Sequence, residues 1–227
     1  ISVLSPDGNS SRIQFGSTSD NDIGHIGGFY NSGNEYLFFS VDGSTRMVIG
    51  GATNSGNVGI GTDNPGHTLV VKGASGTSPV INVINSDTED NDTGRESTIR
   101  FSGFRSGGEA VDNGQITGTH DGSSDDDKGM LTFFTNGGSG QTEKMRITSA
   151  GNVGIGTNAP DCNLDVAVAS GQQRVRIASL SSGNALLDIQ AGGANDPKIR
   201  FYEDTTFKWQ INNNAGGSDR LEIINGS

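Results

Sequence analysis

The residues of this chain best suited to chemistry lie in two acidic runs. Residues 87–92 read Asp-Thr-Glu-Asp-Asn-Asp, and residues 121–127 read Asp-Gly-Ser-Ser-Asp-Asp-Asp. Carboxylate oxygens are calcium ligands, and a pair of carboxylates can hydrolyse a glycosidic bond. Neither run has the spacing of an EF-hand loop, and aromatic residues that could line a sugar groove make up only 6% of the chain. We therefore interpret both runs as solvated loops and expect no cofactor, no metal and no catalytic residue.

Other reactive side chains are few. The histidines, His25, His67 and His120, are dispersed and lack metal-ligand spacing. Cys162 is the single cysteine, which excludes a disulfide within one chain and favours a small buried or neutral side chain over an inter-chain link or a catalytic thiol. The chain has no Gly-x-Ser-x-Gly nucleophile elbow. These observations predict a protein that is not an enzyme.

A glycine-rich connector, Gly-Asn-Val-Gly-Ile-Gly-Thr, occurs at residues 56–62 and again at residues 151–157. A dinucleotide-binding loop would need a third glycine opening a helix, whereas here Gly59 and Gly61 are followed by Asn64 and Pro65. The connector therefore does not predict a phosphate site. Each copy leads through a proline into a Leu-x-Val segment, so it reads as part of a structural repeat.

The repeat unit is a series of short strands separated by Gly-, Asn- and Asp-rich turns. Its opening strands are expected at 13–15, 99–101 and 199–201, its second strands at 23–29, 114–120 and 209–212, its third strands at 36–41 and 130–135, and its closing strands at 46–49, 144–147 and 220–223. The least regular region, 165–180, alternates in a way that favours a strand. The pattern predicts three modules, 1–73, 74–168 and 169–227. The third stops where the others enter the connector, so we expect the native polypeptide to continue or to have been trimmed.

The composition is too poor in apolar residues for an ordinary globular domain. Hydrophobic residues, glycine not counted, make up 31% of the chain, against about 38–43% in typical domains once their glycine, about 7%, is also left out. A chain with regular strands and little core can complete that core with copies of itself. The formal net charge of −11 weighs against nucleic-acid binding, and no apolar run is long enough to insert into a membrane.

The connector indicates where the copies meet. Read as a strand, it turns Val58, Ile60 and Thr62 to one face and glycines to the other, which a neighbouring strand could approach closely. The predicted trimer core consists of Val58, Ile60, Val153 and Ile155. The predicted fold class is all-β, with repetitive short-strand meander modules joined by connectors in an intertwined homotrimeric β-fibre of β-prism or triple-β-helix type.

The segment from Met145 to Val166, and with a three-residue insertion the segment from Met47 to Val71, resembles repeats of bacteriophage tail-fibre and tailspike-type proteins. That family often ends in an endosialidase-type chaperone domain. The resemblance implies a trimeric β-fibre on a virion or on an extracellular appendage. Its implied partners are copies of itself, other virion tail proteins, and a glycan or protein of the host surface.

The predicted function is that of a structural and adhesive tail-fibre segment, which projects or forms a receptor-binding surface. The alternatives are a glycan-binding module, a polysaccharide depolymerase of a tailspike, and a bacterial surface adhesive fibre. Candidate ligand contacts are Tyr30, His120 and Trp209, because aromatic rings can stack on sugars and a histidine can bind at a turn.

Overall fold

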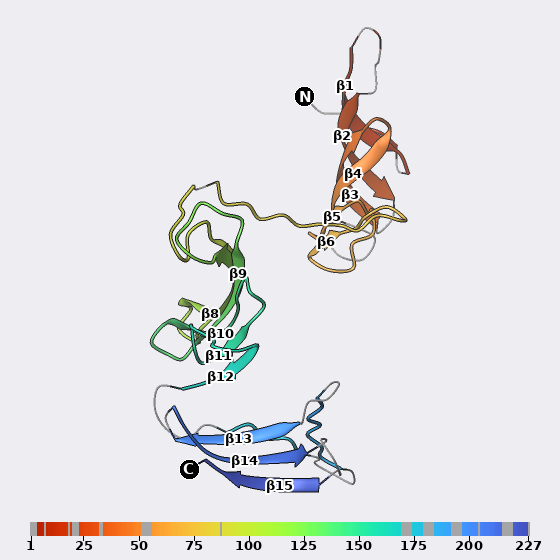
Figure 1. Cartoon of the computed structure of the whole chain (residues 1–227). Coiled ribbons are helices and arrows are strands. Elements are labelled where there is room, and N and C mark those ends of the chain that lie inside the picture. The colour runs from red at the N-terminus through yellow and green to blue at the C-terminus, as the bar shows by residue number, and fades with distance from the viewer. Residues whose placement is uncertain are drawn as a thin grey trace. The chain divides into compact units, whose positions relative to one another are not determined.

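The computed structural model describes residues 4–6, 8–17, 19, 23–31, 34–50, 56–86, 88–168, 174–178, 184–191, 197–203, 205–214 and 220–226. These residues form strands and turns and contain no helix (Figure 1), which confirms the prediction of an all-β chain. No helix suited to crossing a membrane occurs in the described part of the chain. By compactness the chain divides into residues 1–142 and 143–227, and its strands form three separate sheets.

The first sheet has six strands in sequence order, and each pairs with the next. Its strands are β1 (Ser10–Phe15), β2 (Gly24–Asn31), β3 (Asn34–Val41), β4 (Ser44–Gly50), β5 (Val58–Ile60) and β6 (Leu69–Val71). All neighbours are antiparallel except β5 and β6, which run parallel. Asp42 and Gly43, with φ of 52° and 66°, form the two-residue turn between β3 and β4; positive φ at both positions is what a type I′ hairpin turn requires.

The second sheet repeats this topology. Its strands are β7 (Ser97–Phe104), β8 (Ala110–His120), β9 (Gly129–Asn136), β10 (Gln141–Ile147), β11 (Val153–Ile155) and β12 (Leu164–Val166). They neighbour one another in sequence order, and β11 and β12 again form a parallel pair. The recurrence of the sequence motif is therefore also a recurrence of strand order and of the final parallel pair.

The third sheet is smaller and departs from the expected module. It consists of β13 (Lys198–Glu203), β14 (Thr206–Asn214) and β15 (Arg220–Asn225), in that order and antiparallel. The repeat predicts residues 220–223 in a closing strand separated from the second strand by a third, but β15 pairs directly with β14. Residues 174–178 belong to no strand, so the alternation over 165–180 yields only β12; residues 169–173 and 179–180 lie outside the described residues.

The hydrophobic core of the described chain is very small. Three hydrophobic residues are buried within it, namely Phe38, Val48 and Met130. Among the residues that the structure describes, thirty-two large hydrophobic ones are exposed. The low apolar content therefore produces the shortage of core that the composition predicts, because much of the apolar surface that the chain does have faces outward.

Candidate functional site: an exposed apolar sheet face

The two connectors close their sheets with the same set of hydrogen bonds. The Asn57 side-chain amide donates to the carbonyl of Pro65 at 2.9 Å, and Asn152 donates to Pro160 at 3.3 Å. The amide of Gly61 donates to the Arg46 carbonyl at 2.9 Å, and in the second connector Gly156 donates to Lys144 at the same distance. Each connector is thus an ordered segment whose short strand pairs antiparallel with the strand before it and parallel with the strand after it.

The glycines of the first connector are required by contacts within the same chain. A Cβ on Gly59 would come within 3.0 Å of the Val48 side chain and would clash with the Thr62 carbonyl. Gly61 has φ of 73° and lies just after the strand. The prediction of a seven-residue strand is therefore wrong, since only Val58–Ile60 is extended and Thr62 lies beyond it. The close neighbour expected from another copy is supplied here by the chain itself.

One face of the first sheet is apolar from edge to edge, and we call it the apolar face. Directly paired residues share a face of a sheet. The central row across the six strands is Ile13, Ile26, Phe39, Met47, Ile60 and Val71. The adjacent row is Ser11, Gly28, Leu37, Ile49, Val58 and Leu69. Val58 and Ile60 of the predicted trimer core are thus two members of a much larger surface.

The apolar face is open to solvent in the single chain. Ile13 is 59% exposed, Leu37 42%, Ile60 43% and Leu69 57%. Contiguous apolar patches of this kind are rare on monomeric proteins and mark sites of association. The other apolar members of the two rows, apart from Ile26, are partly buried, namely Phe39, Met47, Ile49, Val58 and Val71. No apolar member of the two rows is fully buried by the described part of the chain.

The second sheet carries the same residue types in the same order. Ile99, Ile116 and Phe133 align across β7–β9, and Met145, Ile155 and Val166 align across β10–β12. The adjacent rows read Ser97, Gly118 and Leu131, then Ile147, Val153 and Leu164. Within β7–β9 and within β10–β12, these aligned sets therefore match the first sheet residue type for residue type. Ile99, Ile155 and Leu164 are 54%, 40% and 61% exposed.

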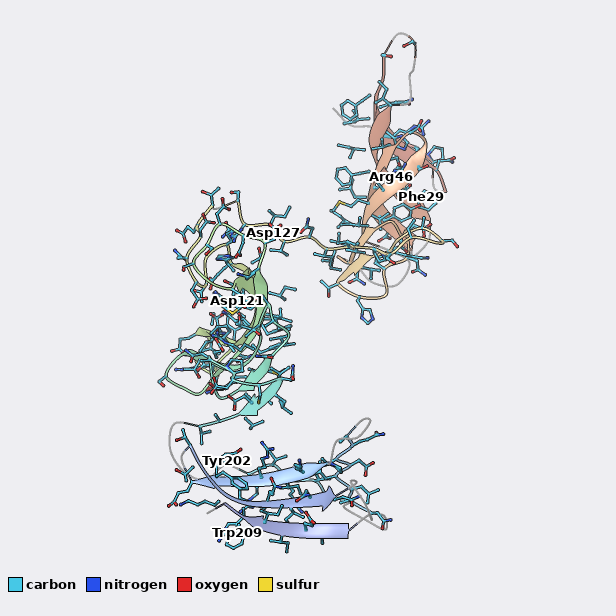
Figure 2. The ribbon with its side chains drawn as sticks, viewed as in Figure 1. Phe29, Arg46, Asp121, Asp127, Tyr202 and Trp209 are labelled. Atoms are coloured by element: carbon cyan, nitrogen blue, oxygen red, sulfur yellow. The ribbon has the colours of Figure 1, made fainter. Side chains whose placement is uncertain are left out.

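The third sheet also has a row of aligned apolar residues, which is shorter because the sheet has three strands. Ile199, Ile211 and Ile223 align across its three strands, and Phe201 pairs with Trp209 two residues further along. Figure 2 shows Trp209 projecting from this sheet, where it is 47% exposed. Because residues two apart in a strand share a face, Trp209 lies on the same side as the isoleucine row. Trp209, a candidate ligand contact, therefore belongs to the corresponding apolar face of the third sheet.

The opposite faces of the first two sheets are satisfied within the chain and differ in chemistry. In the first sheet Phe38 pairs with Val48, and both are buried. In the second sheet the buried residues include Thr117 and Thr132, whose hydroxyl donates to the Thr117 carbonyl at 3.2 Å, and Arg146, which donates twice to Glu143 at 2.6 and 2.7 Å. The residue types of the exposed face are thus repeated, while those of the buried face vary.

His120 connects two loops of the second module. Its side chain is 1% exposed, Nδ1 lies 3.1 Å from the carbonyl oxygen of Asn91, and Nε2 lies 3.1 Å from Oδ1 of Asp126. Both partners offer acceptor oxygens, so this arrangement favours the imidazolium form, in which both ring nitrogens donate. The Asn91 carbonyl first, and then the Asp126 carboxylate, raises the pKa of His120. This buried ring has a structural task and offers no nitrogen to an external ligand.

The acidic run at 121–127 is organised around Asp126. The Lys128 ammonium lies 2.9 Å from its carboxylate, and that hydrogen bond, followed by the one from His120, holds the pKa of Asp126 far below its usual range. Arg95 donates to its backbone carbonyl at 2.8 Å. Asp121 and Asp127, at the two ends of this run, are labelled in Figure 2. Within the described ranges no three His, Cys, Asp or Glu side chains gather in a way that could hold a metal ion.

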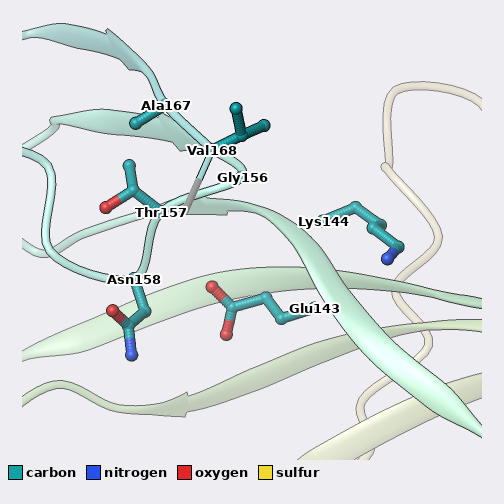
Figure 3. A pocket seen from close by; sticks show the side chains of 7 residues that line it. All are labelled: Glu143, Lys144, Gly156, Thr157, Asn158, Ala167 and Val168. Atoms are coloured by element: carbon teal, nitrogen blue, oxygen red, sulfur yellow. The ribbon is translucent and has the colours of Figure 1, made fainter. Parts of the chain in front are cut away.

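A pocket of about 500 Å³ lies beside the second connector (Figure 3). It is lined by Glu143, Lys144, Gly156, Thr157, Asn158, Ala167 and Val168. Glu143 is the one carboxylate among these residues, and it is already paired with Arg146. A retaining or inverting glycosidase needs two carboxyl groups, so this pocket has no hydrolytic pair.

Two further sequence candidates have simple outcomes. The backbone of Tyr30 lies in β2 and pairs with Glu35, and its side chain lies outside the described residues. Cys162 is exposed, with its thiol 3.1 Å from the Leu164 carbonyl oxygen, so the expectation of a buried or neutral side chain is wrong as to burial.

No protein-family model matches the chain. No curated protein matches it either. The repeated sheet face and the motif resemblance of the connectors are therefore the two observations that bear on function. Sequence patterns indicated only Val58, Ile60, Val153 and Ile155 of that face. The signal for the other members was the recurrence of Ile, Phe and Met at equivalent strand positions. This recurrence does not show that the residues lie in one row, because that depends on the register between strands.

Proposed function

We propose that this chain is a segment of a homotrimeric β-fibre, of the kind found in bacteriophage tail fibres, and that the apolar faces of its sheets form the interior of the trimer. The observation that carries the proposal is the recurrence of two aligned sets of residues, Ile-Ile-Phe over the first three strands and Met-Ile-Val over the last three, in both six-stranded sheets. Ile60 and Ile155, which belong to these sets, are 43% and 40% exposed. In a symmetric assembly of parallel chains each module meets its own copies. Such an assembly requires each module to present a face that can be buried against its own copies, and both six-stranded sheets present an apolar one.

The proposal accounts for the difference between the two faces. The buried face is completed by the same chain, so its chemistry can change from Phe38 and Val48 to Thr117 and Thr132. The exposed face must be buried against other copies in every module, which favours apolar residues there in each module. The subunit number of three comes from the resemblance to tail-fibre repeats, since the apolar face alone would also suit a dimer.

The proposed role is to hold or present a host-attachment surface outside the cell, as part of a virion. In such a trimer Trp209 is enclosed with the rest of its face, and His120 is already enclosed by its own module. Receptor contacts are therefore expected in the loops between strands, where the modules differ in length and charge. The partners are copies of the chain, neighbouring tail proteins, and a host glycan or protein.

The decisive experiment is a mass measurement by size-exclusion chromatography with light scattering. The wild-type chain should elute at three times the mass of one chain. Ile60→Asp should abolish the trimer because it places three carboxylates inside the apolar interior. The matched control is Asn64→Asp, which adds the same charge to the exposed turn after the first connector. A wild-type monomer at micromolar concentration, or a dimer, would overturn the trimeric fibre.

The same pair of changes can be made in the second module. Ile155→Asp should prevent assembly there, while Ala159→Asp, in the exposed turn after the second connector, should not. Trimers that persist in both isoleucine-to-aspartate variants would mean that the Ile rows do not lie at the interface.

A further inference from the structure

In the sequence, the segment 79–85 falls between β6 of the first sheet and β7 of the second, and it belongs to neither sheet. Three of its four aliphatic residues are among the most exposed large hydrophobic residues of the described chain, with Val80 78%, Ile84 75% and Ile81 69% exposed, and Val83 is 49% exposed. Four neighbouring aliphatic side chains open to water carry a hydration cost that folding of one chain does not remove. The segment therefore resembles the apolar face in lacking a cover, although it forms no strand.

The order of residues in this segment has a period of three. It reads Pro-Val-Ile-Asn-Val-Ile-Asn, so Val, Ile and Asn each recur after three residues. In a strand, where side chains alternate, each face would mix aliphatic and amide groups. In an extended conformation with three residues per turn, as in polyproline II, the valines align on one edge, the isoleucines on the next and the asparagines on the third. Two thirds of the surface is then apolar and one third is polar.

Charge in this region also suits contact between identical copies. Residues 73–86 contain no charged side chain, in a chain whose formal net charge is −11. Charged residues begin directly outside this stretch, with Lys72 on one side and the acidic run on the other. Identical segments can thus lie side by side without like charges facing one another.

We propose that residues 79–85 of three copies of this chain pack together around the trimer axis, with Val80, Ile81, Val83 and Ile84 inside and the asparagine edges outside. This inference rests on the proposed function and adds a second self-association element, built from the linker rather than from a sheet. The corresponding stretch before the third sheet, residues 174–178, reads Arg-Val-Arg-Ile-Ala. It has neither the period of three nor the absence of charge, so the inference concerns the first linker alone.

The test compares thiol labelling at two adjacent positions of the full chain. Cys162 is exposed, so both variants are made in a Cys162→Ser background, kept reduced, and reacted with a maleimide. In a packed linker Ile81→Cys should label at least about tenfold more slowly than Asn82→Cys. Both cysteines should label at equal rates when Ile60→Asp is added, because that change separates the copies.

A stability measurement supplies an independent readout. Ile81→Asp should lower the melting temperature of the trimer by more than about 5 °C, and Asn82→Asp by less than about 2 °C, because each destabilising kcal/mol shifts a domain of this size by about 2–4 °C. A wild-type trimer in which both cysteines label equally and both aspartate variants melt together would overturn this inference and leave the proposed function standing. A wild-type monomer would overturn both.

Discussion

Shortening Ile60 to alanine tests the apolar face without introducing a charge. The side chain is 43% exposed in the single chain, and burying a whole isoleucine contributes about 1.5–3 kcal/mol. Assembly that covers the remaining surface therefore gains about 0.7–1.3 kcal/mol per chain, or about 2–4 kcal/mol per trimer. Ile60→Ala should lose most of this, which corresponds to roughly a 30- to 1,000-fold weaker trimer.

The assay is a dilution series monitored by sedimentation or light scattering. The matched control is Asn64→Ala, at an exposed position in the turn after the first connector. The wild type and the control should dissociate at the same concentration, and Ile60→Ala at a much higher one. Because the change removes only half-buried atoms from the single chain, its effect must depend on protein concentration. An equal loss of stability at every concentration would show that Ile60 contributes to the fold of one chain and not to assembly.

Three further outcomes can be measured. Gly59→Ala should destabilise its module by about 1–3 kcal/mol in denaturant unfolding because its Cβ meets close neighbours, whereas Gly66→Ala, which has nothing within 4 Å, should stay within about 0.5 kcal/mol; similar values for the two would contradict the packing described. Gly43→Val should cost about 1–2 kcal/mol, since φ is 66° there, and an unchanged midpoint would refute the turn. His120 has a raised pKa, so its contribution to the stability of the folded chain should be complete below its ordinary pKa of about 6.5 and be lost as pH rises through the higher folded value. Melting temperatures measured from about pH 5 to about pH 9 should show this loss in the wild type and not in His120→Gln. Parallel curves for the two proteins would exclude His120 as the cause.

Much of the architecture could be predicted because local signals and the repeat agree. The Asp42–Gly43 pair indicates a hairpin, and the structure has it. The two connectors predict equivalent units, and their hydrogen bonds are equivalent. These features depend on a few neighbouring residues, which is the scale at which sequence patterns are informative.

The remaining features depend on contacts between distant residues. Ile13 and Ile60 lie in one row only because the three strands between β1 and β5 keep a particular register, which no local pattern specifies. His120 has the sequence context of a surface turn, but it is enclosed by Asn91 and Asp126 from two loops. Residues 220–223 have the composition of a closing strand and nevertheless pair directly with β14, since composition does not identify the neighbour.

The identity of the two connectors has a consequence for how such proteins change size. Residues 56–62 and 151–157 are the same seven residues and make matching hydrogen bonds. Joining the first connector directly to residue 158 would remove 95 residues, 63–157, as one complete unit and leave an intact connector. Inserting a second copy of residues 63–157 after residue 157 would add one such unit. A chain of this kind can therefore be lengthened or shortened in whole units without a new type of junction.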